Sequence, residues 1–151
     1  VDAGLARLAN SLPSDAQLLI TADHGMVNVD YDARIDLADH PEVCELVSAV
    51  GGEPRATHLY TPRPQETASA INEIGAGRVH AMVRNQAVTD GWFGPVRTQN
   101  LGRIGDVVVI SEAGTAIVDS RSDSPSALKL RGHHGGITAD ELAIPLIVLR
   151  P

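Results

Sequence analysis

The sequence predicts an α/β fold, with a partly parallel sheet, flanking helices and a small inserted α+β subdomain. Short apolar runs near the two ends, over 18–20 and 143–149, are typical of buried strands. Between residues 57 and 84, a strand-like run, a helical pattern and a second strand-like run follow one another. The composition, 43% apolar and 21% charged, is that of a globular domain, so these patterns describe a folded chain.

The first third of the chain predicts two helices with a strand between them. Apolar residues at helical spacing predict a helix that is stopped by Pro13, and a strand over 17–22 follows. Residues 41–50 predict the clearest helix, because a proline opens the first turn and apolar side chains recur at i, i+3, i+4 and i+7. A Gly-Gly pair follows directly, as is typical where a helix ends.

The middle of the chain predicts a unit that closes on itself. Its expected elements are a strand over 57–61, a helix over 64–74, a strand over 80–84, a short helix near 85–92, and a hairpin of strands over 106–110 and 115–118. The chain is therefore expected to have three parts. These are a core segment over 1–52, an inserted α+β subdomain over 53–119, and a return to the core over 120–151.

The net charge, the cysteine count and the apolar runs exclude some kinds of binding partner and of structure. A net charge of −7 argues against binding of nucleic-acid polymers, because phosphate backbones select basic surfaces. The single cysteine, Cys44, excludes an internal disulfide framework. No run approaches the ~20 apolar residues that a membrane span needs, so none is expected in this segment. The compartment stays open, with the cytoplasm slightly favoured.

Two short motifs concentrate side chains that bind metals. Thr-Ala-Asp-His-Gly-Met over 21–26 places Asp23 and His24 after the first apolar strand, where α/β sheets place their ligands. Gly-His-His-Gly-Gly over 132–136 adds two adjacent imidazoles. A carboxylate oxygen together with imidazole nitrogen suits zinc, manganese or iron. The sequence therefore indicates a metal site built from both ends of the chain.

These motifs, with Ala-Asp-Glu-Leu-Ala-Ile-Pro-Leu-Ile-Val-Leu after the second, resemble the carboxyl-terminal part of the alkaline phosphatase superfamily. The likeness is strongest to its type I phosphodiesterase/nucleotide pyrophosphatase branch. It implies a hydrolase of phosphate diester or pyrophosphate bonds with two divalent metal ions, zinc in first place and manganese or iron as alternatives. It also implies that Asp23 and His24 bind one metal and that His134 binds the other. His133 is then a rival ligand or a residue that orients one.

The ligand count points to a missing part of the enzyme. Two metals with about four ligands each need more than three side chains. The resemblance places the other ligands, and a Thr or Ser nucleophile, in an amino-terminal half, and no nucleophile is identified in this chain. We expect a carboxyl-terminal fragment, inactive alone and with partial or absent metal binding. Its expected partners are the missing half of the same protein and a small phosphate diester or nucleotide substrate.

Two other classes of function compete with this interpretation. A phosphatase, sulfatase or phosphomutase of the same superfamily uses similar ligands, and a non-catalytic metal-binding or interaction domain needs no nucleophile. Several polar residues have simpler explanations. Thr138 and Glu141 have the spacing of a capping box that opens a short helix. The remaining acids of interest are expected on the surface: Asp36, Asp39, Asp119 and Asp123.

Overall fold

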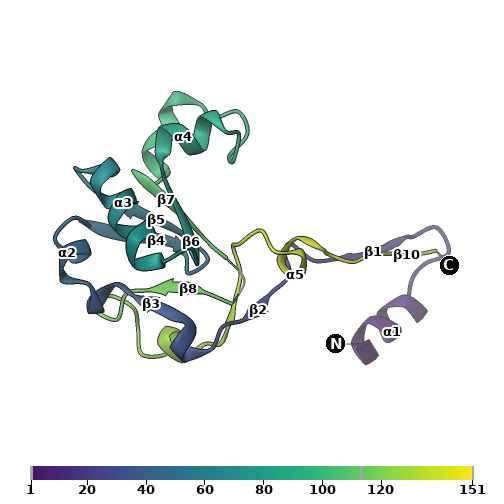
Figure 1. Ribbon diagram of the computed structural model, residues 1–151. Coiled ribbons are helices and arrows are strands. Elements are labelled where there is room, and N and C mark those ends of the chain that lie inside the picture. The colour runs from purple at the N-terminus through teal and green to yellow at the C-terminus, as the bar shows by residue number, and fades with distance from the viewer. Residues whose placement is uncertain (1, 113, 151) are drawn as a thin grey trace.

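The computed structural model describes residues 2–112 and 114–150. Figure 1 shows a body built around a sheet and a two-stranded ribbon, β1 with β10, that projects from one side of it. The body sheet is antiparallel throughout, in the order β4-β5-β7-β6. Its strands are β4 (Ala49–Glu53), β5 (Ala56–Tyr60), β6 (Val79–Val83) and β7 (Val107–Ser111).

Strand β7 is buried on both faces and therefore organises the core. One face packs into a cluster with Leu59, Ile71 and Ile117, and the other into a cluster with Met82 and Ile104. A run of Val-Val-Val-Ile suits this position, because a strand covered on both sides carries apolar residues without alternation. Two helices supply buried side chains to opposite faces: α3 (Pro64–Gly75) and α4 (Arg84–Thr89).

Helix α3 is fastened to the edge strand β6 by one side chain. The amide of Asn72 donates to the carbonyl of Ala81 at 2.9 Å and accepts from its N–H at 2.8 Å. The helix ends at Gly75, and Ala76, its C-cap, adopts a left-handed φ of 47°. This end brings the chain round into β6 within a few residues, so helix and strand form one compact unit.

Three strand pairs bring the two ends of the chain together. The ribbon pairs Leu18–Thr21 (β1) with Leu146–Leu149 (β10), and Val27–Asn28 (β2) pairs with Gly132–His133 (β9), both antiparallel. Arg34–Asp36 (β3) runs parallel to Ala116–Val118 (β8). The remaining short helices are α1 (Asp2–Asn10), η1 (Tyr31–Ala33), η2 (Leu37–Asp39), α2 (Pro41–Cys44), η3 (Thr98–Arg103), η4 (Ala127–Lys129) and α5 (Ala139–Leu142).

The α/β fold class is confirmed, and most elements lie where the sequence predicts them. Among the described residues, the β3–β8 pair is the parallel part of the sheets. The limits of the inserted subdomain stay a prediction, although β4 begins just before the expected boundary at residue 53. Within the described ranges, no helix is long and apolar enough to cross a membrane.

Two predicted elements are wrong for the same physical reason. The helix expected over 41–50 ends at Cys44, because Val50 pairs with Leu59 in the sheet. The expected hairpin does not form either, since β8 pairs with the distant β3 and not with β7. In both cases strand pairing overrides the local pattern: Val50 pairs with Leu59 in the next strand, and β8 pairs with the distant β3.

Asp119 is also not the surface acid that the sequence predicts. Its side chain is buried and accepts two hydrogen bonds from the guanidinium of Arg121, at 2.8 and 2.7 Å. These hydrogen bonds hold the pKa of the carboxyl below its usual value, against the opposing effect of burial. A cation two residues away therefore allows this acid to lie inside the fold.

Truncation of the core at Leu59 tests the packing of the body. We expect Leu59→Ala to lower the free energy of unfolding by about 2–5 kcal/mol, because Leu59 is fully buried between α3 and the sheet. Leu146→Ala should change it by no more than about 0.5 kcal/mol, since that side chain is 68% exposed. Urea unfolding followed by the fluorescence of Trp92, the only tryptophan, measures both; equal losses would contradict this description of the core.

Candidate functional site

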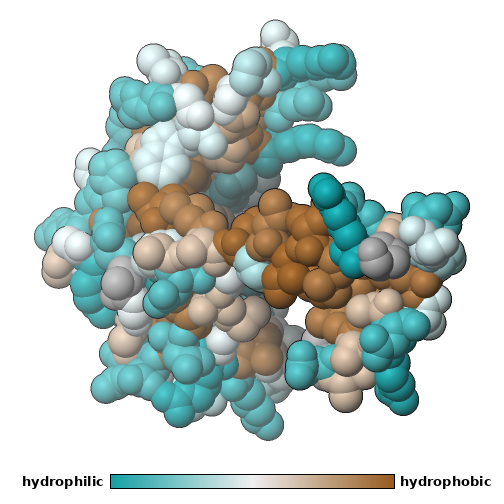
Figure 2. Space-filling view, turned by 90° about the vertical axis from the view of Figure 1, so that its right-hand side faces the viewer, coloured by the Kyte–Doolittle hydropathy of each residue, from teal (hydrophilic) through white to brown (hydrophobic). Residues whose placement is uncertain are grey.

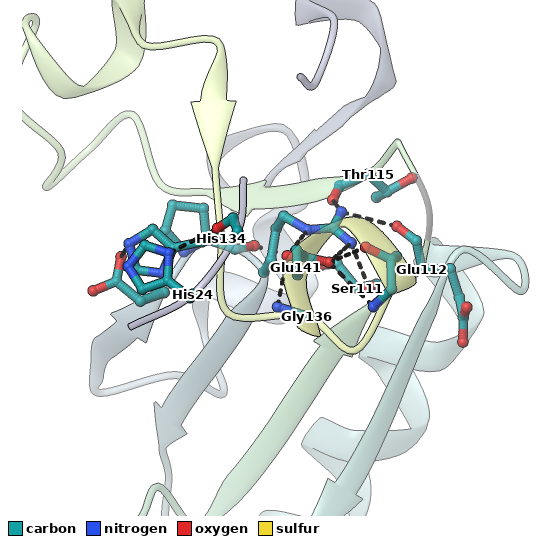
Figure 3. A network of polar contacts seen from close by, with 12 residues as sticks. His24, Ser111, Glu112, Thr115, His134, Gly136 and Glu141 are labelled. Atoms are coloured by element: carbon teal, nitrogen blue, oxygen red, sulfur yellow. Dashed lines mark hydrogen bonds and ion pairs between the residues drawn. The ribbon is translucent and has the colours of Figure 1, made fainter. Parts of the chain in front are cut away.

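The two sequence motifs meet through their histidines. The imidazole rings of His24 and His134 stack, with centroids 3.7 Å apart and an interplanar angle of 16°. The β2–β9 pairing produces this contact, because its register sets Val27 opposite His133. The turn that follows the first ribbon strand therefore faces the turn that follows β9 (Figure 3).

His24 is held in a tautomer that suits a ligand. Its Nδ1 lies 2.7 Å from the carbonyl oxygen of Gly25, which can only accept, so Nδ1 is the donor and, in the neutral ring, Nε2 carries the lone pair. The Asp23 carboxylate lies 3.7 Å from that Nε2 and is 90% exposed. Asp23 and His24 therefore present one oxygen and one nitrogen donor side by side at the surface.

His134 faces an acid that the sequence analysis did not single out. Its Nε2 lies 3.8 Å from a carboxylate oxygen of Glu53, and both side chains are partly exposed. Glu53 ends β4, whose first two residues the sequence predicts as the end of a helix, whereas Glu53 itself is expected to open the inserted subdomain. No local signal identified this acid, because the turn that carries His134 comes from the other end of the chain.

His133 points into the protein, away from this group. It is 5% exposed, and its Nε2 lies 3.1 Å from the carbonyl oxygen of Leu130. Burial lowers the pKa of its imidazole, and the nearby charge of Arg34 lowers it further. His133 is therefore a neutral, buried side chain that donates to the backbone, and of the adjacent pair only His134 stacks on His24.

The donor chemistry suits a divalent metal, but the set is incomplete. One carboxylate and an imidazole with a free Nε2 are ligands that zinc, manganese or iron accept. In the described part of the chain, no three His, Cys, Asp or Glu side chains converge closely enough to hold a metal ion. The described residues therefore form part of a candidate centre.

A buried ion pair lies beside the two histidine-bearing turns. Arg55 and Glu141, with side chains 0% and 2% exposed, form a two-pronged contact of 2.6 Å from Nε and 2.9 Å from Nη2 (Figure 3). The remaining guanidinium hydrogens are donated to backbone carbonyl oxygens of Ser111, Glu112 and Thr115. The pair therefore joins α5 to the segment between β7 and β8.

Glu141 also completes the capping box that the sequence predicts. Its carboxylate accepts from the backbone N–H of Thr138 at 3.3 Å, as the box requires, and also from the Thr138 hydroxyl at 2.7 Å and the N–H of Gly136 at 2.8 Å. Its own carbonyl oxygen accepts from the N–H of Gly25 at 2.8 Å. The capping interpretation is confirmed, but Arg55 was missed, since an arginine between Pro54 and Ala56 carries no sign of complete burial.

Comparison with known proteins agrees with the motifs. The sequence profile of the family described as type I phosphodiesterase / nucleotide pyrophosphatase matches residues 1–137. No curated protein matches the sequence. Human ectonucleotide pyrophosphatase/phosphodiesterase 5 is similar in structure, with a TM-score of 0.63 and 18% identity, over 98% of this chain and 36% of that chain.

Two further solved structures share the fold. The murine form of the same ectonucleotide pyrophosphatase/phosphodiesterase has a TM-score of 0.70 and 16% identity, over 99% of this chain and 38% of that chain. Phosphonoacetate hydrolase from Sinorhizobium meliloti, in complex with phosphonoacetate, has a TM-score of 0.64 and 23% identity, over 99% and 39%. The chain thus spans well under half the length of these solved relatives.

Acid titration tests the electrostatics of the ion pair. Burial alone raises the pKa of Glu141, but hydrogen bonds from Arg55, Thr138 and Gly136 together lower it from 4.5 to about 2. A pKa lowered by folding stabilises the fold above the unfolded value. That contribution, about 3 kcal/mol, is therefore full above pH 4.5 and is lost as the pH falls towards 2.

We expect Glu141→Gln to remove this part of the pH dependence. The difference in unfolding free energy between the parent chain and the variant should shrink as the pH falls from 4.5 to 2. Urea unfolding at several pH values measures it, and the difference cancels the acid titration of Asp36 and Asp119, whose pKa values are also lowered. A difference that stays constant over that range would show that folding does not lower the pKa of Glu141.

Proposed function

Because the chain belongs to the type I phosphodiesterase/nucleotide pyrophosphatase family, we propose that it forms part of the metal centre of an enzyme that hydrolyses phosphate diester or pyrophosphate bonds. In this proposal Asp23 and His24 bind one divalent ion and His134 binds a second. The ions are zinc, with manganese or iron as alternatives. His133 stays outside the coordination shell and supports the turn from within.

The proposal rests mainly on the stacking of His24 on His134. Their ring centroids lie 3.7 Å apart, and two-metal centres hold their ions roughly 3.5–4 Å apart. Two imidazoles at this separation suit ligands of neighbouring ions. The hydrogen bond from His24 Nδ1 to the Gly25 carbonyl supports the assignment, since it fixes the ring and leaves Nε2 free.

Bound divalent ions would supply charge that activates an attacking oxygen and stabilises a leaving oxygen. The chain's own residues orient that chemistry. His24 is fixed by its backbone hydrogen bond, Asp23 offers an exposed carboxylate, and Glu53 places a second carboxylate beside His134. We assign no nucleophile to this chain, so the attacking side chain and the other ligands are assigned to the rest of the protein.

The exposed apolar surface of the ribbon supports the proposal that a further part of the same protein packs against it. Figure 2 looks onto the end of the molecule that carries the ribbon and shows hydrophobic residues gathered in a continuous patch. Strands that are apolar on both faces are typical of a sheet covered on both sides. The exposed apolar side chains of this end include Leu19, Leu142, Ile144, Leu146, Ile147 and Val148.

We propose that the remainder of the chain covers these residues and completes the ligand set. The solved relatives are much longer than this chain, which spans 36% of one and 39% of another. The murine relative was solved as an inactive variant in complex with AMP, and the bacterial one with phosphonoacetate. A small molecule with a phosphorus oxyanion, a nucleotide or phosphate diester in first place, is the substrate class that we propose.

Metal analysis of two adjacent histidine variants tests this function. In the intact protein, we expect His134→Ala to lose one of two bound metals. His133→Ala should keep both and lower metal affinity or activity by no more than about 10–100-fold. His80→Ala, an exposed histidine of β6, is the matched control and should change neither. Full metal occupancy in His134→Ala with depletion in His133→Ala would reverse the assignment.

Turnover in the same preparations separates the competing reactions. The intact protein should hydrolyse a nitrophenyl ester of a nucleotide faster than a phosphate monoester or a sulfate ester, and the 151-residue chain should not exceed buffer with the same metal. Preference for a monoester or sulfate would favour the phosphatase or sulfatase alternative. Metal binding without any turnover would favour a non-catalytic domain.

A further inference from the structure

We propose that Glu141, held by Arg55, is a positioning residue that sets the distance between the two halves of the candidate metal centre. This inference rests on the proposed function for its consequence, but its geometry stands without a metal. Glu141 touches the turn after His24 through its backbone and the turn after His134 through its side chain. One residue therefore holds both halves of the centre.

The two contacts lie very close to the stacked histidines. The Glu141 carbonyl oxygen accepts from Gly25, which directly follows His24. The Glu141 carboxylate accepts from Gly136, two residues after His134. Each contact is 2.8 Å long, so a movement of α5 shifts both turns, and loss of either contact leaves the β2–β9 pairing as the link between them.

The packing leaves no room for a side chain between α5 and either turn, at Gly25 or at Gly136. A Cβ added at Gly25 would lie 1.8 Å from the backbone oxygen of Asp140. A Cβ added at Gly136 would lie 2.7 Å from both Arg55 Nη2 and a Glu141 carboxylate oxygen. Both glycines therefore let the backbone rest directly on the ion pair and its helix.

Arg55 orients the carboxylate of Glu141. Its guanidinium meets Glu141 through two parallel hydrogen bonds, which fixes direction as well as distance. Its remaining donors bind carbonyl oxygens at the ends of β7 and β8. Arg55 therefore fixes the position of the Glu141 carboxylate relative to the body of the protein. A buried pair of this kind often adds little stability compared with apolar residues of equal volume. Geometric specification of the two turns is the role that these contacts support.

Nuclear magnetic resonance of the metal-free 151-residue chain tests the geometry. Stacked rings shift each other's imidazole resonances, so His24→Ala should move the His134 resonance and His134→Ala should move that of His24. We expect this mutual shift to disappear in folded Glu141→Gln, while the resonance of His80 stays in place. A mutual shift that persists in folded Glu141→Gln would overturn the proposal.

Three further variants separate positioning from stability. Gly25→Ala leaves both residues of the ion pair in the sequence but forces the turn at Gly25 and α5 apart, because the added Cβ would lie 1.8 Å from the Asp140 carbonyl oxygen. It should therefore also lose the mutual shift, and it decides the question if Glu141→Gln does not fold. Gly102→Ala, whose added Cβ meets nothing within 4 Å, should keep the shift. Leu59→Ala lowers stability away from the turns and should keep it as well. If Leu59→Ala lost the mutual shift as completely as Gly25→Ala, the loss would follow from lower stability and not from the contacts of Glu141.

Zinc titration of the intact protein provides the second readout. Glu141→Gln should weaken zinc binding by about 10–100-fold, as expected when a group that orients ligands is changed, and Leu59→Ala should not. Unchanged affinity in folded Glu141→Gln would overturn the positioning role. If the parent protein binds no zinc, manganese or iron, the proposed function fails, while the resonance measurement still decides the geometry.

Discussion

The placement of both motifs depends on the buried ion pair between Arg55 and Glu141. It joins residues that lie 86 positions apart, and through Glu141 it reaches the turns that follow His24 and His134. Removal of charges from water costs several kcal/mol per ion, which cancels much of the attraction within such a pair. The ion pair therefore contributes to the geometry of the fold more than to its stability. The planar guanidinium has donors in fixed directions, and these define where α5 lies against the body sheet.

Within the described residues, the candidate metal centre lacks ligands, and the ribbon beside it lacks a packing partner. The proposed function explains both. The candidate metal centre has donors from both ends of the chain but too few of them in the described residues. The ribbon beside it exposes apolar side chains such as Leu146 at a level that a packed sheet does not show. A further part of the same protein that covers the ribbon and adds ligands accounts for both features. The body around β7 needs no such partner for its own core.

The sequence predicted those features that depend on neighbouring residues. Helix α3 and its flanking strands follow from local periodicity, and the capping box at Thr138 from spacing alone. The extended conformation of Val50 and the pairing of β8 did not follow, because pairing with the next strand in one case, and with the distant β3 in the other, overrode local preference. The candidate ligands came from motifs and a family resemblance, whereas their stacking required the β2–β9 register. Arg55 gave no signal, since burial of a charge depends entirely on what surrounds it.

Anomalous diffraction at the zinc edge, from crystals of the intact protein with zinc, tests the central claim most directly. We expect two neighbouring peaks. One should lie at about 2.0–2.1 Å from His24 Nε2 with Asp23 beside it, and the other at the same distance from a ring nitrogen of His134. Both turns should still rest on Glu141. Zinc bound through other residues, or stacked histidines with no metal on either ring, would contradict the account.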